Sequence, residues 1–126
     1  MIIGVGVDIV PIDRIRRQGD AEAFFAEVLT PSELHPGESA VHASERFARI
    51  FAVKEAVLKA LGCGLRPGFV WHDIAVENSS RVRLSGLPQR LAQELSVSTI
   101  HVSHSCSQNF AVAFVLLESH NPEVTS

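Results

Sequence analysis

The chain has 126 residues and a mass of 13.7 kDa, the size of a single domain. Its hydrophobic fraction of 46% and charged fraction of 20% are those of an ordinary globular protein, which excludes a disordered acidic tail or a collagen-like repeat. Eleven basic and fourteen acidic residues give a net charge of -3 and a pI near 6.0, without the basic excess that binding to a nucleic-acid backbone requires. Nucleic acid is not an expected partner.

The N-terminal residues and the two cysteines indicate the cellular compartment of the protein. No apolar run is long enough to span a membrane, and the opening MIIGVGVDIV lacks a basic leader. We expect Cys63 and Cys106 to be reduced, because two cysteines cannot staple a chain of this size. These features predict a cytoplasmic protein without membrane attachment. We expect one domain over residues 1–118 and a flexible C-terminal tail over 119–126.

The first predicted element is a strand over residues 2–10, because hydrophobic residues alternate there with small or polar ones. One face carries the apolar side chains Ile3, Val5, Val7 and Ile9, and the other carries Gly4, Gly6 and Asp8. We expect the apolar face to belong to the core. The glycine face lets another backbone or a ligand approach closely.

Helices follow the first strand. Pro11 ends the strand and starts a helix that carries a basic cluster, Arg14, Arg16 and Arg17. A second helix is predicted over residues 21–29, and Thr30-Pro31-Ser32-Glu33 has the form of a capping box at the start of a short third helix. The strongest helical pattern covers residues 44–61 and ends at Gly62, in the left-handed cap position.

The second half of the chain alternates between strands and a helix. Strands are predicted over residues 73–77, 81–84, 99–104 and 110–117, with a helix over 87–95. Together with the long helix, this order predicts an α+β fold in which a small antiparallel sheet packs against a long central helix and shorter helices.

The long helix carries two kinds of side chain. Phe47, Ile50, Phe51, Leu58 and Leu61 share one arc, the usual buried stripe, while Ala48, Ala52, Glu55 and Lys59 share another. Two interpretations of the second arc stay open. Glu55 and Lys59 form an ordinary exposed ion pair one turn apart, and Asp8 caps the helix after its strand. Alternatively, the alanine arc packs on the glycine face of the first strand, so that Asp8 and Glu55 supply two carboxylates to Mg²⁺ and Lys59 neutralises a phosphate.

His101 and Ser103 share one face of the predicted strand over residues 99–104, and His104 lies on the other. His101 and His104 therefore cannot bind one zinc ion from a regular strand. The pair His101 and Ser103 is either a polar wall that contacts a substrate or the wet face of an antiparallel sheet.

Four sequence blocks together resemble a known family. They are Gly4-Val5-Gly6-Val7-Asp8-Ile9-Val10 with Arg14-Ile15, Leu29-Thr30-Pro31-Ser32-Glu33-Leu34, Phe51-Ala52-Val53-Lys54-Glu55-Ala56 with Lys59-Ala60-Leu61-Gly62, and His101-Val102-Ser103. Their order and spacing over nearly the whole chain resemble those of the holo-(acyl-carrier-protein) synthases, the short class of 4'-phosphopantetheinyl transferases.

The resemblance implies a reaction and a set of site residues. Such enzymes move the phosphopantetheine arm of coenzyme A (CoA) to a serine of an apo acyl carrier protein and release adenosine 3',5'-bisphosphate. It implies that Asp8 and Glu55 bind Mg²⁺ across the CoA pyrophosphate and that Lys59 offsets phosphate charge. Lys59, Glu55 and a metal-bound water are the candidate bases for the serine.

The resemblance also implies how the partners bind. Gly62 and Gly64 would lie near CoA, His101 and Ser103 would line its cleft, and Arg14 would contact the acidic carrier protein, which the basic cluster would attract. Family members of this length are homotrimers with CoA between neighbouring subunits. Whether the carrier serves fatty-acid or polyketide synthesis stays open.

Three positions depart from the family pattern. Ile50 stands where the family usually has arginine, with Arg49 one place earlier, and Cys63 and Cys106 stand where threonine and histidine are common. These departures leave the predicted metal ligands intact but change the surroundings of CoA. Two alternative functions therefore remain: a non-catalytic CoA- or nucleotide-binding domain of the same fold, and a purely structural trimerising module.

Overall fold

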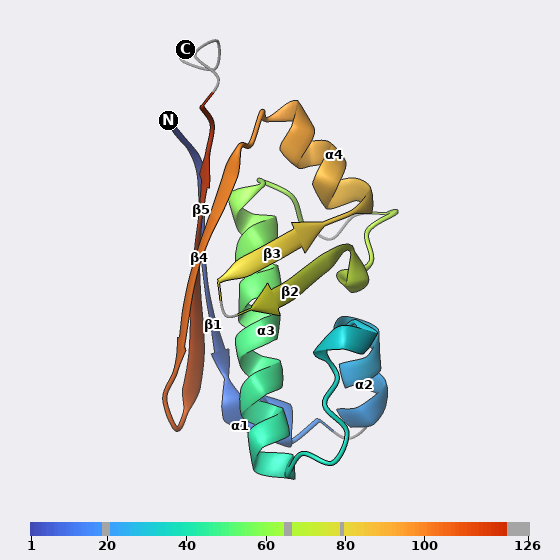
Figure 1. The fold of residues 1–126 in the computed structure, drawn as a ribbon. Helices are drawn as coiled ribbons and strands as arrows, with labels where there is room; N and C mark the ends of the chain where they lie inside the picture. The colour runs from blue at the N-terminus through green and yellow to red at the C-terminus, as the bar shows by residue number, and fades with distance from the viewer. Residues whose placement is uncertain (19–20, 65–66, 79, 121–126) are drawn as a thin grey trace.

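A computed structural model describes residues 1–18, 21–64, 67–78 and 80–120. Its elements, in chain order (Figure 1), are β1 (Ile2–Pro11), α1 (Ile12–Arg16), α2 (Ala21–Val28), η1 (Pro31–Glu33), α3 (Ala40–Ala60), η2 (Trp71–Asp73), β2 (Ile74–Asn78), β3 (Arg81–Leu84), α4 (Gly86–Glu94), β4 (Thr99–Cys106) and β5 (Phe110–Glu118). The predicted elements are present in the predicted order. The two segments labelled η are single turns of 3-10 helix.

The long helix α3 begins four residues earlier than predicted. Ser39 is its N-cap, and the side-chain oxygen of Ser39 accepts the backbone N–H of His42 at 3.3 Å. The helix ends as predicted, because Gly62 has a φ of 71°, in the left-handed region that glycine adopts without strain. Within the described ranges, no helix combines the length and the hydrophobicity needed to cross a bilayer.

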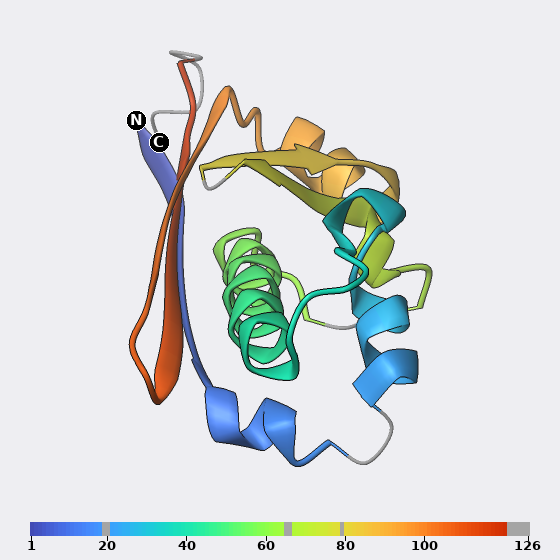
Figure 2. The ribbon, with the colours of Figure 1, turned by 60° about the horizontal axis from the view of Figure 1, so that its bottom comes forward.

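The strands form two antiparallel sheets rather than one. The larger has three strands in the order β1-β5-β4, and the smaller is the hairpin of β2 and β3. Figure 2 shows α3 between the three-stranded sheet and a second layer that contains α2 and the hairpin. The layers confirm the predicted α+β fold, with a small antiparallel sheet against a long central helix.

The backbones of β1 and α3 touch, as the glycine face of β1 predicted. A Cβ atom added to Gly6 would lie 1.9 Å from the carbonyl oxygen of Ala56, and one added to Gly4 would lie 2.3 Å from that of Ala60. No side chain fits in such a space. The inner face of β1 therefore lies directly on α3, which brings the next inner-face residue, Asp8, to the side of the helix.

The prediction that the apolar face of β1 belongs to the core is wrong for the single chain. The exposed fractions of Val5, Val7 and Ile9 are 50%, 45% and 60%. The cause is the close contact just described, because only the glycine face lets α3 approach. The neighbouring strand β5 adds Phe110, Val112 and Phe114 to the same uncovered outer face.

A buried ion pair holds the other side of α3. Lys54 and Glu33 are 0% and 1% exposed in their side chains, and the Lys54 ammonium donates to Glu33 Oε1 at 2.8 Å and to the Val28 carbonyl at 2.5 Å. Glu33 also accepts the backbone N–H of Thr30 at 2.8 Å, as the predicted capping box requires, and that of Val76 at 2.6 Å. Burial lowers the pKa of Lys54, and the bond to Glu33 opposes this.

The end of the described chain is tied to its start. Ser119 donates its backbone N–H to the Met1 carbonyl at 2.8 Å and accepts the Met1 ammonium at 2.9 Å, while the backbone N–H of His120 donates to Ser98 Oγ at 3.0 Å. The domain and tail boundary at residue 118 stays a prediction, because residues 121–126 lie outside the described part of the chain.

Candidate active site

The structure brings Asp8 and Lys59 together, although 51 positions separate them in the chain. The Lys59 ammonium donates to Asp8 Oδ1 at 2.7 Å and to the Val7 carbonyl at 3.1 Å. Glu55 lies one helical turn before Lys59 on the same side of α3. Lys59 of α3 is therefore paired with Asp8 of β1, and the interpretation in which Lys59 pairs on the surface with Glu55 is wrong.

Glu55 belongs to the same electrostatic cluster. Its pKa is raised, mainly by burial and then by the charge of Asp8, while the charges of Lys59 and Arg14 oppose the shift. The pKa of Lys59 is raised, first by its hydrogen bond to Asp8 and also by the charges of Asp8 and Glu55. Two acids and two bases from β1, α1 and α3 thus influence one another.

Asp8 contains an unsatisfied oxygen. Its Oδ2 atom is buried and has no hydrogen-bond partner among the residues that the structure describes. Leaving a buried charged oxygen without a donor is costly, and a bound cation would remove that cost. Among the described residues, no group of three acidic, histidine or cysteine side chains is placed to hold a metal ion, either at Asp8 or elsewhere. Mg²⁺ fits such a site, since it often uses one or two carboxylates and completes its shell with water and phosphate oxygens.

His101 and Ser103 do not join this cluster. Both are exposed on the outer face of the sheet, opposite Leu116 and Phe114 of β5, whereas Asp8 is on the inner face. His101 Nε2 lies 2.9 Å from Glu118 Oε1, and this hydrogen bond lowers the pKa of Glu118. The wet-face interpretation therefore describes the single chain, and a role for these two residues toward CoA stays a prediction.

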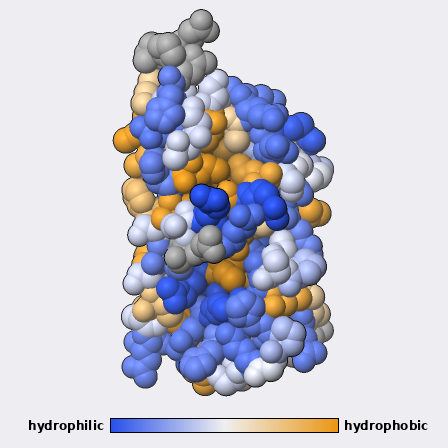
Figure 3. Space-filling view, viewed as in Figure 1, coloured by the Kyte–Doolittle hydropathy of each residue, from blue (hydrophilic) through white to orange (hydrophobic). Residues whose placement is uncertain are grey.

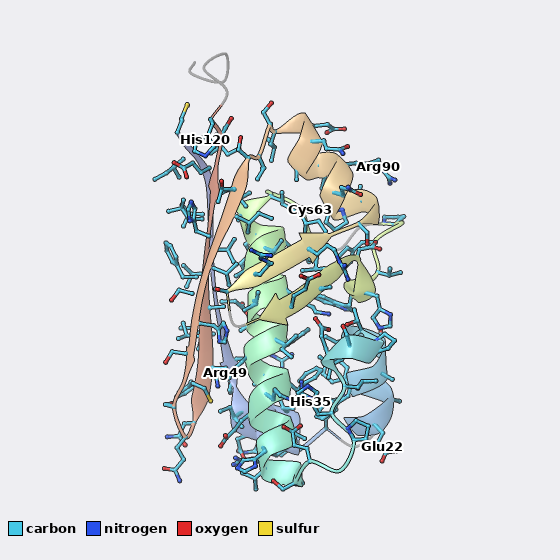
Figure 4. The ribbon with its side chains drawn as sticks, in the orientation of Figure 1. Glu22, His35, Arg49, Cys63, Arg90 and His120 are labelled. Carbon is cyan, nitrogen blue, oxygen red and sulfur yellow. The ribbon has the colours of Figure 1, made fainter. Side chains whose placement is uncertain are left out.

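The histidine on the inner face is His104. Asp8 pairs with Ala113 of β5, and Ala113 pairs with His104 of β4, so the three residues form one row across the sheet. His104 Nδ1 accepts the Nε–H of Arg49 at 3.3 Å, and Arg49 lies between α3 and the sheet (Figure 4). Arg49, which lies one place before the usual position of the family arginine, thus contacts β4.

Two adjoining cavities, of about 420 and 300 Å³, form a basic cleft beside α3. We call it the basic cleft; its cationic or potentially cationic lining residues are His35, Arg46, Arg49, Arg83 and His104, and its acidic ones are Glu33 and Glu77, of which Glu77 pairs with Arg83 at 3.1 Å. Strongly hydrophilic side chains gather across the middle of this face of the molecule (Figure 3). The sequence does not predict the basic cleft, because its residues come from separate elements. Only Arg46 and Arg49 have the spacing of neighbours on one helix.

The carboxylates and the basic cleft lie on opposite sides of α3. Glu55 and Arg46 are nine residues apart in one helix. At about 100° per residue this separation is half a turn around the axis. In one chain, therefore, a ligand at Asp8 and Glu55 faces away from the basic cleft.

The turn after α3 is open. Among the described residues, no atom lies within 4 Å of a Cβ added to Gly62 or Gly64, and the backbone N–H of Gly62 donates to the Lys59 carbonyl at 3.1 Å. Cys63 between them is buried. The turn thus follows the Lys59 end of the site directly and presents bare backbone to solvent.

Comparisons with known proteins agree on one family. The model of the 4'-phosphopantetheinyl transferase superfamily matches residues 4–115. The holo-(acyl-carrier-protein) synthases of Koribacter versatilis and Geobacter sulfurreducens are 40% and 41% identical to this chain over 94% of its length, covering 99% and 98% of their own lengths.

Solved structures give the same result. The holo-ACP-synthase of Plasmodium yoelii has a TM-score of 0.81 at 29% identity and covers 96% of this chain and 98% of its own. The Bacillus anthracis holo-(acyl-carrier-protein) synthase, solved in complex with CoA (3',5'-ADP), has a TM-score of 0.72 at 35% identity, with 94% and 98% coverage. With its fold and nearly its whole length matched, this chain belongs to the 4'-phosphopantetheinyl transferase superfamily.

Proposed function

We propose that the chain is a Mg²⁺-dependent holo-(acyl-carrier-protein) synthase, which transfers 4'-phosphopantetheine from CoA to a serine of an apo acyl carrier protein. The observation that supports it best is the cluster of Asp8, Glu55 and Lys59, in which a buried Asp8 oxygen has no partner among the described residues. Its relatives and structural neighbours bear the name of this activity, and three of those structures were solved with CoA.

Each group of the cluster has a role in this proposal. Asp8 and Glu55 hold Mg²⁺, which when bound would stabilise negative charge on the CoA phosphates. Lys59 supplies a further positive charge for a phosphate oxygen. The serine oxygen of the carrier attacks the β-phosphorus of CoA, and the bond from that phosphorus to the oxygen bridging it to the α-phosphate breaks. Adenosine 3',5'-bisphosphate leaves with that oxygen, and the serine proton passes to a base or to water.

Arg14 is proposed to meet the carrier protein. In the described part of the chain, Arg17 pairs with Asp13 and Arg16 lies 3.9 Å from Glu45, whereas Arg14 has no acidic side chain within ion-pair distance. Arg14 is exposed on α1, and its charge reaches Glu55. An acidic carrier docked at α1 would therefore be held close to the carboxylate cluster.

The uncovered face of the sheet supports a homotrimer. β1 and β5 expose a continuous apolar surface there, which soluble proteins commonly cover with another subunit. In one chain the carboxylates of Asp8 and Glu55 face away from the basic cleft. In the proposed trimer, the basic cleft of a second copy, with its His101 and Ser103, would face these carboxylates. In this arrangement CoA lies between neighbouring subunits.

Phe114→Glu should disrupt this assembly. Phe114 is 43% exposed at the centre of the outer face, on the middle strand, so a carboxylate there would have to be desolvated in an apolar contact. Light scattering coupled to gel filtration should show trimers for the wild type and monomers for the variant, together with loss of transfer. Glu94→Gln, on exposed α4, is the control and should remain trimeric. If Phe114→Glu remained a trimer, the outer face of the sheet would not be the contact between subunits.

Mass spectrometry of the carrier tests the proposed activity. Incubation with CoA, Mg²⁺ and an apo acyl carrier protein should add one phosphopantetheinyl group to the carrier, and none to a carrier whose acceptor serine is replaced by alanine. Absence of any gain with several carriers, while calorimetry shows CoA binding, would instead indicate the non-catalytic binding domain. Absence of CoA binding as well would indicate the structural module.

A further inference from the structure

The Lys59 ammonium covers the one Asp8 oxygen that is not buried. One carboxylate oxygen, Oδ2, is buried and faces no solvent, and the other, Oδ1, is covered by the Lys59 ammonium at 2.7 Å. The same ammonium is held by the Val7 carbonyl at 3.1 Å. A cation arriving from solvent therefore meets a positive charge bonded to the ligand that it needs.

The two partners differ in freedom. The Asp8 side chain is 10% exposed on a strand packed directly against α3, so it has little room to move. The Lys59 side chain is 54% exposed, and its flexible four-carbon stem starts in the last turn of α3. Separating the pair therefore requires a movement of Lys59 and not of Asp8.

We propose that Lys59 acts as a latch on Asp8, which the phosphates of CoA open by drawing the ammonium away, so that CoA binding makes the metal site available. This inference rests on the proposed function. A phosphate oxygen is the alternative partner for the ammonium, and its negative charge replaces that of Asp8. Lys59 then exchanges one anion, the Asp8 carboxylate, for another, a phosphate of CoA.

The latch has a thermodynamic consequence. If CoA removes a competitor of the metal from Asp8, then CoA raises the metal affinity by a factor in addition to any direct contact between its phosphates and the ion. The metal must raise the CoA affinity by the same overall factor, because binding linkage is reciprocal. Exposed ion pairs are individually weak, so the contribution of the latch should be about fivefold in affinity.

Binding of Mn²⁺ as a paramagnetic substitute for Mg²⁺ tests the latch without catalysis. Free Mn²⁺ is measured by electron paramagnetic resonance for the whole chain with and without saturating CoA, in the absence of carrier protein and against a Mn²⁺–CoA blank. The variants are Lys59→Gln, which removes the latch, and Arg14→Gln, which removes another positive charge that acts on Glu55 but leaves the bond between Lys59 and Asp8.

The expected result has two parts. Without CoA, Lys59→Gln should bind Mn²⁺ about fivefold more tightly than the wild type, and the further gain on adding CoA should be smaller than in the wild type by the same factor. Arg14→Gln should keep the full gain on adding CoA.

Three results would overturn the inference. Unchanged or weaker Mn²⁺ binding by Lys59→Gln without CoA would show that Lys59 does not compete with the metal. An equal effect of Arg14→Gln would assign the change to overall charge and not to the bond with Asp8. If the wild type bound neither Mn²⁺ nor CoA, the proposed function itself would fail, and with it the latch.

Discussion

Glu55→Gln should reduce the rate of phosphopantetheine transfer by on the order of 10³-fold, because the amide keeps the shape of the side chain but removes the charge that we propose holds the metal. The measurement is the rate at which apo carrier gains mass at saturating CoA and Mg²⁺. The exposed Glu94→Gln variant on α4, which makes the same chemical change far from Asp8, should transfer at the wild-type rate. Transfer by Glu55→Gln at the wild-type rate would show that Glu55 is not a metal ligand.

The same variant should not be less stable than the wild type. Burial and the charge of Asp8 raise the pKa of Glu55, so its ionised form costs stability above the pKa that the carboxyl has in the unfolded chain. A neutral glutamine lacks this cost at pH 7. In metal-free buffer the free energy of unfolding should therefore be equal or higher, which separates lost catalysis from lost folding. A large loss of stability would mean that Glu55 supports the fold.

Glu33→Ala should destabilise the chain by about 3–5 kcal/mol, because it leaves the fully buried Lys54 ammonium without its carboxylate. The variant also removes the acceptor of the part-buried backbone N–H of Val76, which donates to Glu33 Oε2. Urea unfolding at one fixed protein concentration is the measurement, since the stability of the proposed trimer would depend on concentration.

A double variant separates charge from packing in this prediction. Glu33→Gln with Lys54→Met removes both charges together, and replacement of a whole buried ion pair by uncharged groups is often close to neutral. The double variant should therefore recover most of the stability that Glu33→Ala loses. If Glu33→Ala unfolded at the wild-type urea concentration, the ion pair would not be holding α3 against its neighbours.

Local signals in the sequence predicted most of the fold. The capping box at Thr30 and Glu33, the left-handed cap at Gly62 and the alternation in β1 each depend on neighbours within a few positions, and the structure contains all three. The helix boundary at Ala40 was missed because Ser39 lies in a polar segment that gives no hydrophobic period.

Alternation in a strand separates two faces without telling which of them meets the core. For this reason the sequence predicts a core position for the apolar face of β1, whereas the glycine face is the one that approaches α3. The same ambiguity applies to β4. The sequence indicates His101 as the candidate site residue, but His101 lies on the outer face and the inner face carries His104. The family resemblance supplied Asp8, Glu55 and Lys59 as a set, which spacing alone had left open.

Apart from the contact of β1 with α3, contacts between distant segments had no local signal. Lys54 and Glu33 are 21 positions apart, and the only sequence sign of their pairing was that both fall in blocks resembling the family. The basic cleft unites the loop at His35, α3, the hairpin and β4, so its residues are neighbours only after folding.

The contact of Gly4 and Gly6 with α3 makes main-chain atoms the spacer between the two elements that bear Asp8 and Glu55. Main-chain atoms are common to every residue type, so this spacing does not depend on the length of a side chain between the strand and the helix. The corresponding restriction is that even a methyl group at either glycine would push the strand and its carboxylate away from the helix.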